Sequence, residues 1–403
     1  MSDDEVGAPA PAHPPKSHAP PAAIARRRLP VLVFVLLGIA GVSLIAVLLL
    51  SARPARLVVE VAPVTPAPPT TGATVNVPAS IDATGGSDTS AALASFIRGV
   101  PDGSTIAFRA GGTYKLSSAI HLTDRHDLVF EGNGATLRMA GCNVEDSAFL
   151  LDGTPSSRIV IRDFTMIGDN SAAGTTGAFV TGCESQMGVA IYGASNIEIS
   201  GVTISNVHAE CVYIDAGGDP RGVGPWADSI SFHDSTCRLN GRMGVAIAAG
   251  SHVTVSRVTF DRLAISVLDI EPYEPDGGAT YVALTDNIIK GYGNSPQYTA
   301  WLFEGSAYGM TTTTVHDVTI ARNQITAGPV TSANTITTAG LTIKARTSRW
   351  ANFSVTGNSS SVAGSGATMY FEHVDGVTVS GNSQPLTSGS LVWTSDSTNL
   401  SIN

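Results

Sequence analysis

Apolar residues recur at fixed offsets through the C-terminal half of the chain. The same offsets separate the apolar positions of three successive segments: Ile197, Ile204, Val212 and Ile214; Ile230, Cys237, Val245 and Ile247; Val253, Phe260, Leu268 and Ile270. The pattern returns after 33 residues (197 to 230) and again after 23 (230 to 253). Units of this length, with apolar residues separated by one residue, indicate short strands in a solenoid whose units bury their apolar faces only by stacking.

Asparagine occupies one turn position in four of these units. Asn287, Asn323, Asn358 and Asn382 each follow the first apolar residue of their unit at the same offset. Stacked Asn side chains can hydrogen-bond along a column and so fix the register between coils. Turn propensity alone is the alternative explanation, but four residues in one slot favour an internal Asn ladder.

A helix is predicted where the repeat region begins. Residues Ser90–Arg98 follow an N-cap at Asp88 or Thr89. The helix presents one apolar stripe, which consists of Leu93, Phe96 and Ile97. An uncapped solenoid would leave its end strands and its core exposed, so we expect this helix to cover the open end of the coil.

Two short motifs follow the helix, Gly111–Tyr114 (GGTY) and Gly132–Leu137 (GNGATL), with paired apolar strands between them. This arrangement resembles the entry segment of right-handed parallel β-helix proteins of the pectate-lyase-like superfamily, and the resemblance covers about residues 77–403. It implies an all-β fold, a right-handed parallel β-helix with an N-terminal capping helix. It implies little about activity, because function lies in sites grafted onto a shared fold.

An uncharged apolar segment, residues 31–50, precedes the repeats. It is long enough to cross a hydrocarbon core of roughly 30 Å, and the arginines at 26–28 favour a cytoplasmic N-terminus. The alternative is a cleaved signal peptide, which needs a shorter apolar stretch and an A-x-A site. The sequence therefore predicts a single-pass cell-membrane protein with these parts: a disordered cytoplasmic tail at 1–29, a transmembrane helix at 30–51, a Pro/Thr-rich extracellular linker at 52–80 and an extracellular β-helix domain at 81–403.

Composition narrows the partners of the predicted coil. The net charge is −10 and only 14% of residues are charged, and the repeat region has no basic run, so nucleic acid is not expected as a partner. A polar surface of Ser, Thr, Asn and Gly suits an exported protein that meets polysaccharide or cell-wall glycan. No CxxC or HExxH motif occurs, so no metal site is expected.

Four cysteines allow three pairings. An exported location favours disulfide bridges. We favour Cys142 with Cys183, because both lie in glycine-containing loops. Cys237 occupies an inward slot of the repeat, where a buried free thiol is the alternative.

The last strand of each unit, which contains the apolar pair Val212 and Ile214 in the first of the three segments, turns these apolar residues inward. The residues between and directly after the pair therefore point outward and form columns along the stacked coils. Adjacent coils are about 4.8 Å apart, so we expect Glu271 beside Glu304, and Glu304 beside Lys344. Asp215 should lie two coils below Glu271, with only Ala248 between them. The candidate catalytic residues on this face are Asp215, Asp269, Glu271, Glu304, Lys344 and Arg242, and the candidate substrate-binding aromatics are Tyr192, Tyr213, Trp226 and Tyr273.

Two chemistries fit such a cluster. Glycosidic hydrolysis needs one protonated carboxyl and one carboxylate that activates water or attacks the sugar. Uronate lysis needs a base, here Lys344 or Arg242, and Ca²⁺ held by acidic oxygens; no other cofactor is expected. Outward acids can also merely solvate the surface and suppress edge aggregation. A polysaccharide hydrolase or lyase and a non-catalytic β-helix that binds cell-wall glycan or serves as a scaffold therefore both remain open.

Overall fold

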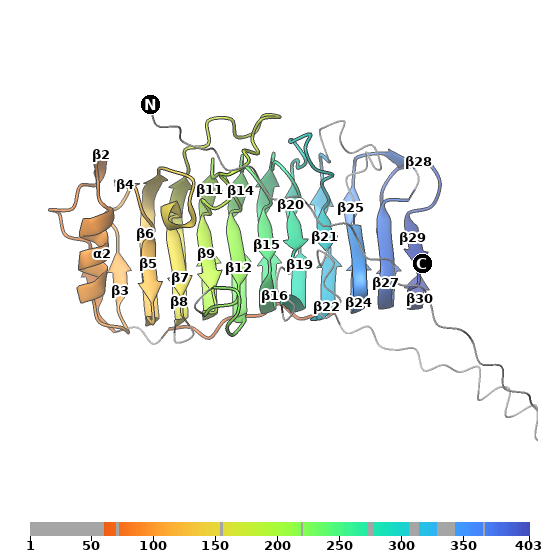
Figure 1. The fold of residues 1–403 in the computed structure, drawn as a ribbon, viewed down its shortest axis with the longest axis horizontal. Coiled ribbons are helices and arrows are strands. Elements are labelled where there is room, and N and C mark those ends of the chain that lie inside the picture. Colours follow the sequence, from red (N-terminus) through yellow and green to blue (C-terminus); the bar gives the residue numbers. More distant parts are fainter. Residues whose placement is uncertain are drawn as a thin grey trace, which may run out of the picture. The chain divides into compact units, whose positions relative to one another are not determined.

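Short parallel strands stacked on one another form the body of the protein (Figure 1). The computed structural model describes these residues: 60–69, 72–153, 156–218, 221–272, 277–305, 314–328, 343–365 and 367–403. Within them the chain passes through three strands per coil, and each strand pairs in parallel with the equivalent strand of the next coil. The protein is therefore an all-β parallel β-helix, as the resemblance predicts.

The strands form three faces, here named A, B and C. Face A contains β1 (Thr74–Asn76), β3 (Thr105–Ala107), β6 (His126–Met139), β8 (Ser157–Ile167), β10 (Ser195–Ser200), β13 (Ala227–His233), β16 (Ala249–Ser256), β19 (Gly278–Thr285), β22 (Thr314–Ala321), β24 (Ile343–Thr356), β27 (Met369–Ser380) and β30 (Thr398–Ile402). Face B contains the second parts of β6 and β8 with β2 (Thr84–Asp88), β4 (Thr113–Leu116), β11 (Thr203–Ser205), β14 (Thr236–Arg238), β17 (Thr259–Asp261), β20 (Ile288–Ile289), β23 (Gln324–Ile325) and β25 (Ser359–Ser360).

Face C contains the first parts of β24 and β27 with β5 (Ile120–Thr123), β7 (Phe149–Asp152), β9 (Val189–Tyr192), β12 (Val212–Asp215), β15 (Val245–Ile247), β18 (Leu268–Ile270), β21 (Phe303–Gly305) and β29 (Val392–Ser395). A short 3₁₀ helix (Val144–Asp146) precedes β7, and β26 (Gly364–Ser365) pairs with β28 (Leu386–Ser388) outside the three faces. Inward apolar side chains from all faces meet in one continuous core along the coil.

Aromatic rings fill the core near the start of the coil. The ring of Phe149 packs edge to face on Phe130 and on Phe164, with centroid distances of 5.3 and 5.6 Å. Edge-to-face contacts suit the quadrupoles of aromatic rings. The predicted inward positions Ile204 and Phe260 are fully buried as well, which confirms the apolar pattern.

The Asn ladder predicted from the sequence is present. Asn287 Nδ2 donates to Asn323 Oδ1 over 2.9 Å, Asn323 Nδ2 donates to Asn358 Oδ1 over 2.8 Å, and Asn358 Nδ2 donates to Asn382 Oδ1 over 2.9 Å. Each Oδ1 also accepts the backbone N–H of the preceding Asn in the ladder. Because Asn287, Asn323 and Asn358 are fully buried, their hydrogen bonds avoid the cost of an orphaned polar group.

Helix α2 (Ser90–Gly99) lies at one end of the coil (Figure 1). Leu93 and Ile97 are buried and Phe96 packs partly buried against the core. Thr89 is the N-cap residue, and Asp88 Oδ1 accepts the backbone N–H of Ser90. The predicted capping helix is therefore confirmed in position and in its apolar stripe.

Two disulfides occur among the described residues, one between two loops and one between two neighbouring coils. Cys142 pairs with Cys183, as predicted. Cys211 pairs with Cys237 between neighbouring coils, which excludes the alternative of a buried free thiol at Cys237. Cys237 is the register partner of Ile204 in the neighbouring coil. Cys211 follows Ile204 by seven residues and directly precedes β12.

The predicted localisation has to be corrected. Among the residues that the structure describes, no helix has the length and apolarity needed to cross a membrane. The predicted tail and span, residues 1–51, lie outside those residues. The prediction of a single-pass membrane protein is therefore corrected: the described structure does not support it. The described parts of the 52–80 range contact the coil: β1 pairs with β3, and residues 60–69 hydrogen-bond to face A.

Candidate functional site

The strand register decides which outward side chains of face C become neighbours. In one column Tyr192 pairs with Asp215, and Ala248 and Glu271 follow in the next two coils, one residue after the paired Ile247 and Ile270. Asp215 and Glu271 thus lie on the same side of the coil, as predicted. Their Cα atoms are two coils apart, about 10 Å at the usual strand spacing.

The second outward column differs from the prediction at one coil. Asp269, not Glu271, is paired with Glu304, while Glu304 is paired with Lys344 as expected. The predicted pair of Glu271 and Glu304 requires Phe303 to pair with Ile270, whereas the structure pairs Gly305 with Ile270. A Cβ atom on Gly305 would collide with the Trp350 ring of the next coil. Trp350 therefore fills the inward slot that an apolar side chain fills in other coils.

Arg242 lies at the centre of a cluster of acidic residues, Glu184, Glu210 and Glu271, which is called the acidic cluster below. Its Nη1 is 3.2 Å from Glu210 Oε1, its Nη2 is 3.5 Å from Glu271 Oε2, and its Nε is 3.6 Å from Glu184 Oε2. Arg242, one of the candidate catalytic residues, therefore contacts one of the predicted acids of face C, Glu271.

Burial sets the electrostatics of this cluster. Glu210 and Glu271 are both fully buried. Loss of hydration disfavours the carboxylate form and raises the pKa of Glu210, while the Arg242 guanidinium opposes the rise and Glu184 adds to it. The cluster thus combines a carboxyl group whose pKa is raised with a second buried carboxyl group paired to the same guanidinium.

Asp215 anchors the half of the site nearer to the capping helix. Tyr213 donates its hydroxyl to Asp215 Oδ2 over 3.0 Å, and the Ala216 N–H donates to Asp215 Oδ1 over 2.7 Å. The Tyr192 ring packs 5.8 Å from the Tyr213 ring. Burial, and then the charge of Asp215, raise the pKa of Tyr192, so its hydroxyl stays protonated and can donate.

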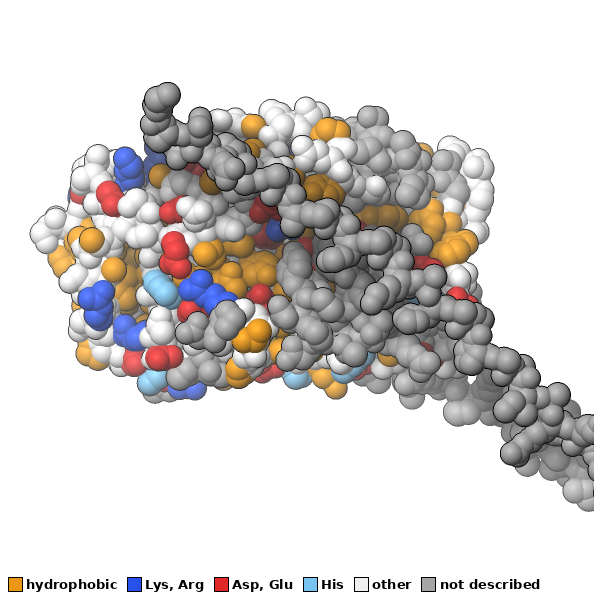
Figure 2. All heavy atoms as spheres, viewed as in Figure 1, with side chains coloured by type: hydrophobic (Ala, Val, Ile, Leu, Met, Phe, Trp, Pro, Cys, Tyr) orange, Lys and Arg blue, Asp and Glu red, His pale blue; other side chains and the backbone are white. Residues whose placement is uncertain are grey.

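Arg221 joins the same half of the site. Its guanidinium lies 4.8 Å above the centre of the Tyr192 ring, and its Nη2 is 2.9 Å from Asp152 Oδ2. Asp152 is the register partner of Tyr192. Figure 2 shows acidic, basic and histidine side chains gathered beside an apolar area in the part of this view nearest the capping helix. Asp152, Tyr192 and Asp215 therefore form a polar stripe that leads to the buried cluster.

Asp269 and Glu304 form the half nearer to the C-terminus. Asp269 is buried and Glu304 is half-buried. Ser266 donates its hydroxyl to Glu304 Oε2 over 3.1 Å and accepts the backbone N–H of Trp301. Lys344 follows Glu304 in backbone register, and its side chain lies outside the described part of the structure.

The segment 168–188 covers the cluster on the side of Glu210. Glu184 of this segment pairs with Arg242. Asn294 Nδ2 donates to Gly174 O, and the Phe179 and Tyr298 rings pack edge to face at 5.1 Å. The segment leaves β8 and therefore reaches the loop after β20, four coils away.

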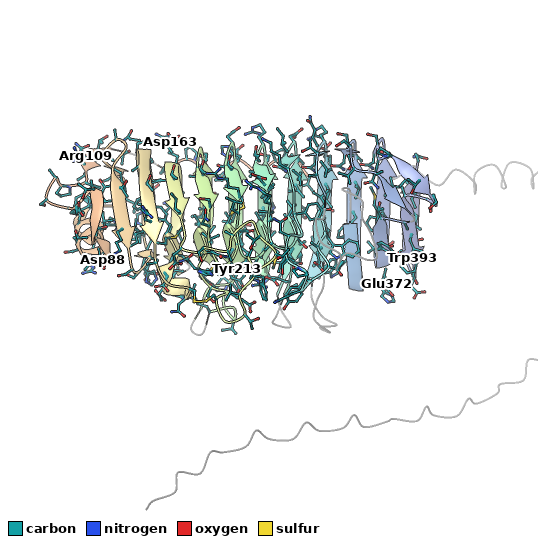
Figure 3. All side chains as sticks on the ribbon, turned by 90° about the horizontal axis from the view of Figure 1, so that it is seen from above. Asp88, Arg109, Asp163, Tyr213, Glu372 and Trp393 are labelled. Atoms are coloured by element: carbon teal, nitrogen blue, oxygen red, sulfur yellow. A yellow bond between two sulfur atoms is a disulfide. The ribbon has the colours of Figure 1, made fainter. Side chains whose placement is uncertain are left out.

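The predicted aromatics are only partly brought to the site. Tyr192 and Tyr213 lie within it, as described above. Trp226 is half-buried directly before β13, in the loop after β12. Tyr273 lies outside the described residues. Figure 3 shows Tyr213, Glu372 and Trp393 along one long side of the coil, opposite Asp163 and Arg109.

The residues present do not fit a Ca²⁺ ion. In the parts of the chain with described side chains, no group of three or more acidic, His or Cys residues is arranged to hold a metal. The Arg242 guanidinium lies among the carboxylates of Glu184, Glu210 and Glu271, where a cation ligated by them would have to bind. We therefore assign no metal to this site.

Sequence reasoning missed Glu210, Glu184 and Arg221. Glu210 stands in a turn just before β12, and the other two lie in long loops, so none occupies a slot of the apolar repeat. The one available signal was a charged residue directly before Cys211 and the β12 strand.

A cavity lined by Val77, Phe108, Arg109 and Tyr114 lies near the capping helix, and none of the acidic residues lines it.

No model of a known protein family matches the chain, and no curated protein matches it in sequence. Its fold is similar to that of an alginate lyase from Paenibacillus sp. str. FPU-7, with a TM-score of 0.51 at 13% identity over 81% of this chain and 99% of that one. PfbA, a surface adhesin of Streptococcus pneumoniae, gives 0.42 at 13% identity over 81% and 93%. A family 28 exopolygalacturonase of Yersinia enterocolitica gives 0.44 at 11% identity over 82% and 78%. The first likeness supports the fold alone.

Proposed function

From the parallel β-helix fold of the pectate-lyase-like superfamily and the acids on face C, we propose that this protein binds polysaccharide along face C and hydrolyses its glycosidic bonds. The observation that carries the proposal is the pairing of two buried carboxyl groups, Glu210 and Glu271, with the single guanidinium of Arg242. The pKa of Glu210 is raised by burial. Solved structures of similar fold include proteins named as an alginate lyase and an exopolygalacturonase, which agrees with a polysaccharide as partner.

In this proposal the two carboxyl groups have different roles. Glu210 donates a proton to the oxygen of the leaving sugar. Glu271, which is paired with Arg242, accepts a proton from the attacking water, so that one water is consumed and two sugar ends are released. Arg242 positions both groups. Asp269 and Glu304, next to each other in register, add negative charge that favours an oxocarbenium-like transition state.

The polysaccharide would approach along the polar stripe of face C. Tyr192 and Tyr213 offer aromatic rings and hydroxyl groups to a sugar, and Trp226 and Tyr273 stay predictions as further sugar contacts. Entry to the cluster requires segment 168–188 to move, because Glu184 contacts Arg242. Loops that move over a rigid scaffold commonly exclude water during catalysis.

Hydrolysis fits these residues better than uronate lysis. A lyase needs a base that can lose its proton, and a guanidinium paired with several carboxylates stays charged. Lys344 stays a prediction as the alternative base. The predicted Ca²⁺ would have to displace Arg242 from the carboxylates that it contacts.

A second candidate is a non-catalytic β-helix that binds glycan or serves as a scaffold. The full burial of Glu210 and Glu271 favours it, because an ion-pair network under a loop can serve structure alone. Under this alternative the exposed parts of face C bind sugar, and the buried acids only hold segment 168–188 in place.

The full chain and three variants distinguish the two candidates when they are incubated with a panel of wall and plant polysaccharides. Hydrolysis predicts new reducing ends without unsaturated uronate, and a loss of about 10²-fold or more in Glu271→Gln and Asp269→Asn. Glu131→Gln, which alters an exposed ion pair with Arg162, is the matched control and should keep full activity. Retention of glycan without product would support the second candidate. Neither product nor retention across the panel would refute both.

A further inference from the structure

Face A carries a column of small residues on its outer side. One outward column of face A consists of Ser231, Thr254, Ala283, Thr319 and Ser354, which are register partners in successive coils. All five are buried, with exposed fractions of 4% or less. Outward residues of a strand ordinarily face solvent, so another part of the molecule must cover this column.

Residues 60–69 lie against this column. The Val61 N–H donates to Thr319 Oγ1 over 3.0 Å, and the Val64 N–H donates to Thr254 Oγ1 over 2.8 Å. The Ala67 N–H donates to Asn196 Oδ1 over 3.3 Å, near the end of the column that is closer to the capping helix. Figure 1 shows this segment in red, crossing the coils along one edge. The N–H groups of every third residue in this segment therefore donate to side chains on every second coil.

The spacing of these contacts matches one backbone conformation. Two coils span about 9.6 Å, and three residues of polyproline II span about 9.3 Å. Polyproline II has three residues per turn, so its N–H groups at every third residue point the same way. A β-strand would instead direct every second N–H to one side. The three-residue period of the donors therefore indicates polyproline II rather than β-pairing.

The sequence of the segment has the same period. It reads Val61-Ala-Pro, Val64-Thr-Pro, Ala67-Pro-Pro. Proline has no N–H and fixes φ near the polyproline II value, and it stands only at positions that donate no bond to the coil. Pro66 is buried. At the start of the segment, Glu60 Oε1 is 2.5 Å from Arg322 Nη1.

We propose that face A is a binding site for polyproline II peptides and that residues 60–69 of the same chain are its occupant. Three features make up its specificity: hydroxyl or amide acceptors on alternate coils, small side chains between them, and Arg322 as the contact for an acidic residue at the N-terminal end of the peptide. The Pro-rich segment is then a docked part of the coil. A free spacer, as its composition alone suggests, would make none of these contacts.

Two proline substitutions in the full chain test this proposal. Val64→Pro removes the N–H that Thr254 accepts, whereas Ala62→Pro changes a residue whose N–H faces away from the acceptors. Hydrogen exchange of single amides by NMR should show slow exchange at Val61, Val64 and Ala67 in the natural chain, and fast exchange at Ala62 and Thr65. Val64→Pro should raise the exchange rates of Val61 and Ala67 by about fivefold, the effect expected for one lost hydrogen bond. Ala62→Pro should leave them unchanged or lower.

Thr254→Val provides a second test that leaves the segment itself intact. It replaces the acceptor hydroxyl by a methyl group of similar size, and Thr65→Val, at an exposed position, is its matched control. Only Thr254→Val should speed exchange at Val64. Equal exchange along residues 61–67 in the natural chain, or equal effects of the members of either pair, would overturn the proposal. Protection that depends on protein concentration would show a second copy as the occupant and would overturn the intrachain assignment.

Discussion

Replacement of Arg242 by methionine should test the electrostatics of the acidic cluster most directly. The variant keeps most of the side-chain volume but removes the charge that Glu210 and Glu271 share. Both carboxyl groups are fully buried, so loss of their cation leaves charge without compensation in a region with little water. Loss of one partner of a buried ion pair costs about 3–5 kcal/mol of unfolding free energy at neutral pH.

The cost should depend on pH, and its sign follows from Glu210. Its pKa in the folded protein lies above the ordinary value of 4.5. Its protonated form is therefore favoured by folding, and the stability that it contributes is present below pH 4.5 and is lost as pH rises through the folded pKa. Without Arg242 that pKa rises further. Arg242→Met should consequently be destabilised more at about pH 7.5 than at about pH 4.

Urea unfolding midpoints at these two pH values, followed by far-UV circular dichroism, measure the effect. Arg257→Met is the matched control, because Arg257 pairs with Asp234 at 2.7 Å while about half of each side chain is exposed. Exposed pairs contribute about 0–1 kcal/mol, so the control should differ little from the natural protein. Equal midpoints for the two variants, or a larger cost of Arg242→Met at acidic pH, would refute this account of the cluster.

Two further predictions concern the coil itself. Asn323→Ala removes an acceptor for the Asn287 side chain and a donor to Asn358, and should lower the unfolding free energy by about 3 kcal/mol; Asn382→Ala, at the end of the ladder, should cost clearly less in the same urea titration, and equal costs would argue against a cooperative ladder. Replacing Cys211 and Cys237 together by alanine opens a link over 26 residues and should cost about 3 kcal/mol; an unchanged urea midpoint under non-reducing conditions would contradict a stabilising bridge.

Much of the fold follows from the sequence because every unit carries the same pattern of apolar residues. Apolar residues two apart in a strand must share a face, and the coils must stack to bury that face. The inward pattern, the Asn ladder and the placement of Asp215 and Glu271 on one flank are direct consequences. The pairing of Glu304 with Asp269 does not follow from this pattern. Gly305 occupies the inward position of its strand, and the Trp350 ring of the next coil fills the space that a side chain there would need.

Residues outside the repeat were decided by the tertiary structure alone. Glu210 and Glu184 lie in turns and loops, where no period constrains position, and only the folded coil brings them to Arg242. The Pro-rich segment has the composition of a spacer, and its docking depends on acceptors that are more than a hundred residues away in sequence. Periodicity is local information that the chain carries by itself, whereas contacts between loops and coils exist only after the coils have stacked.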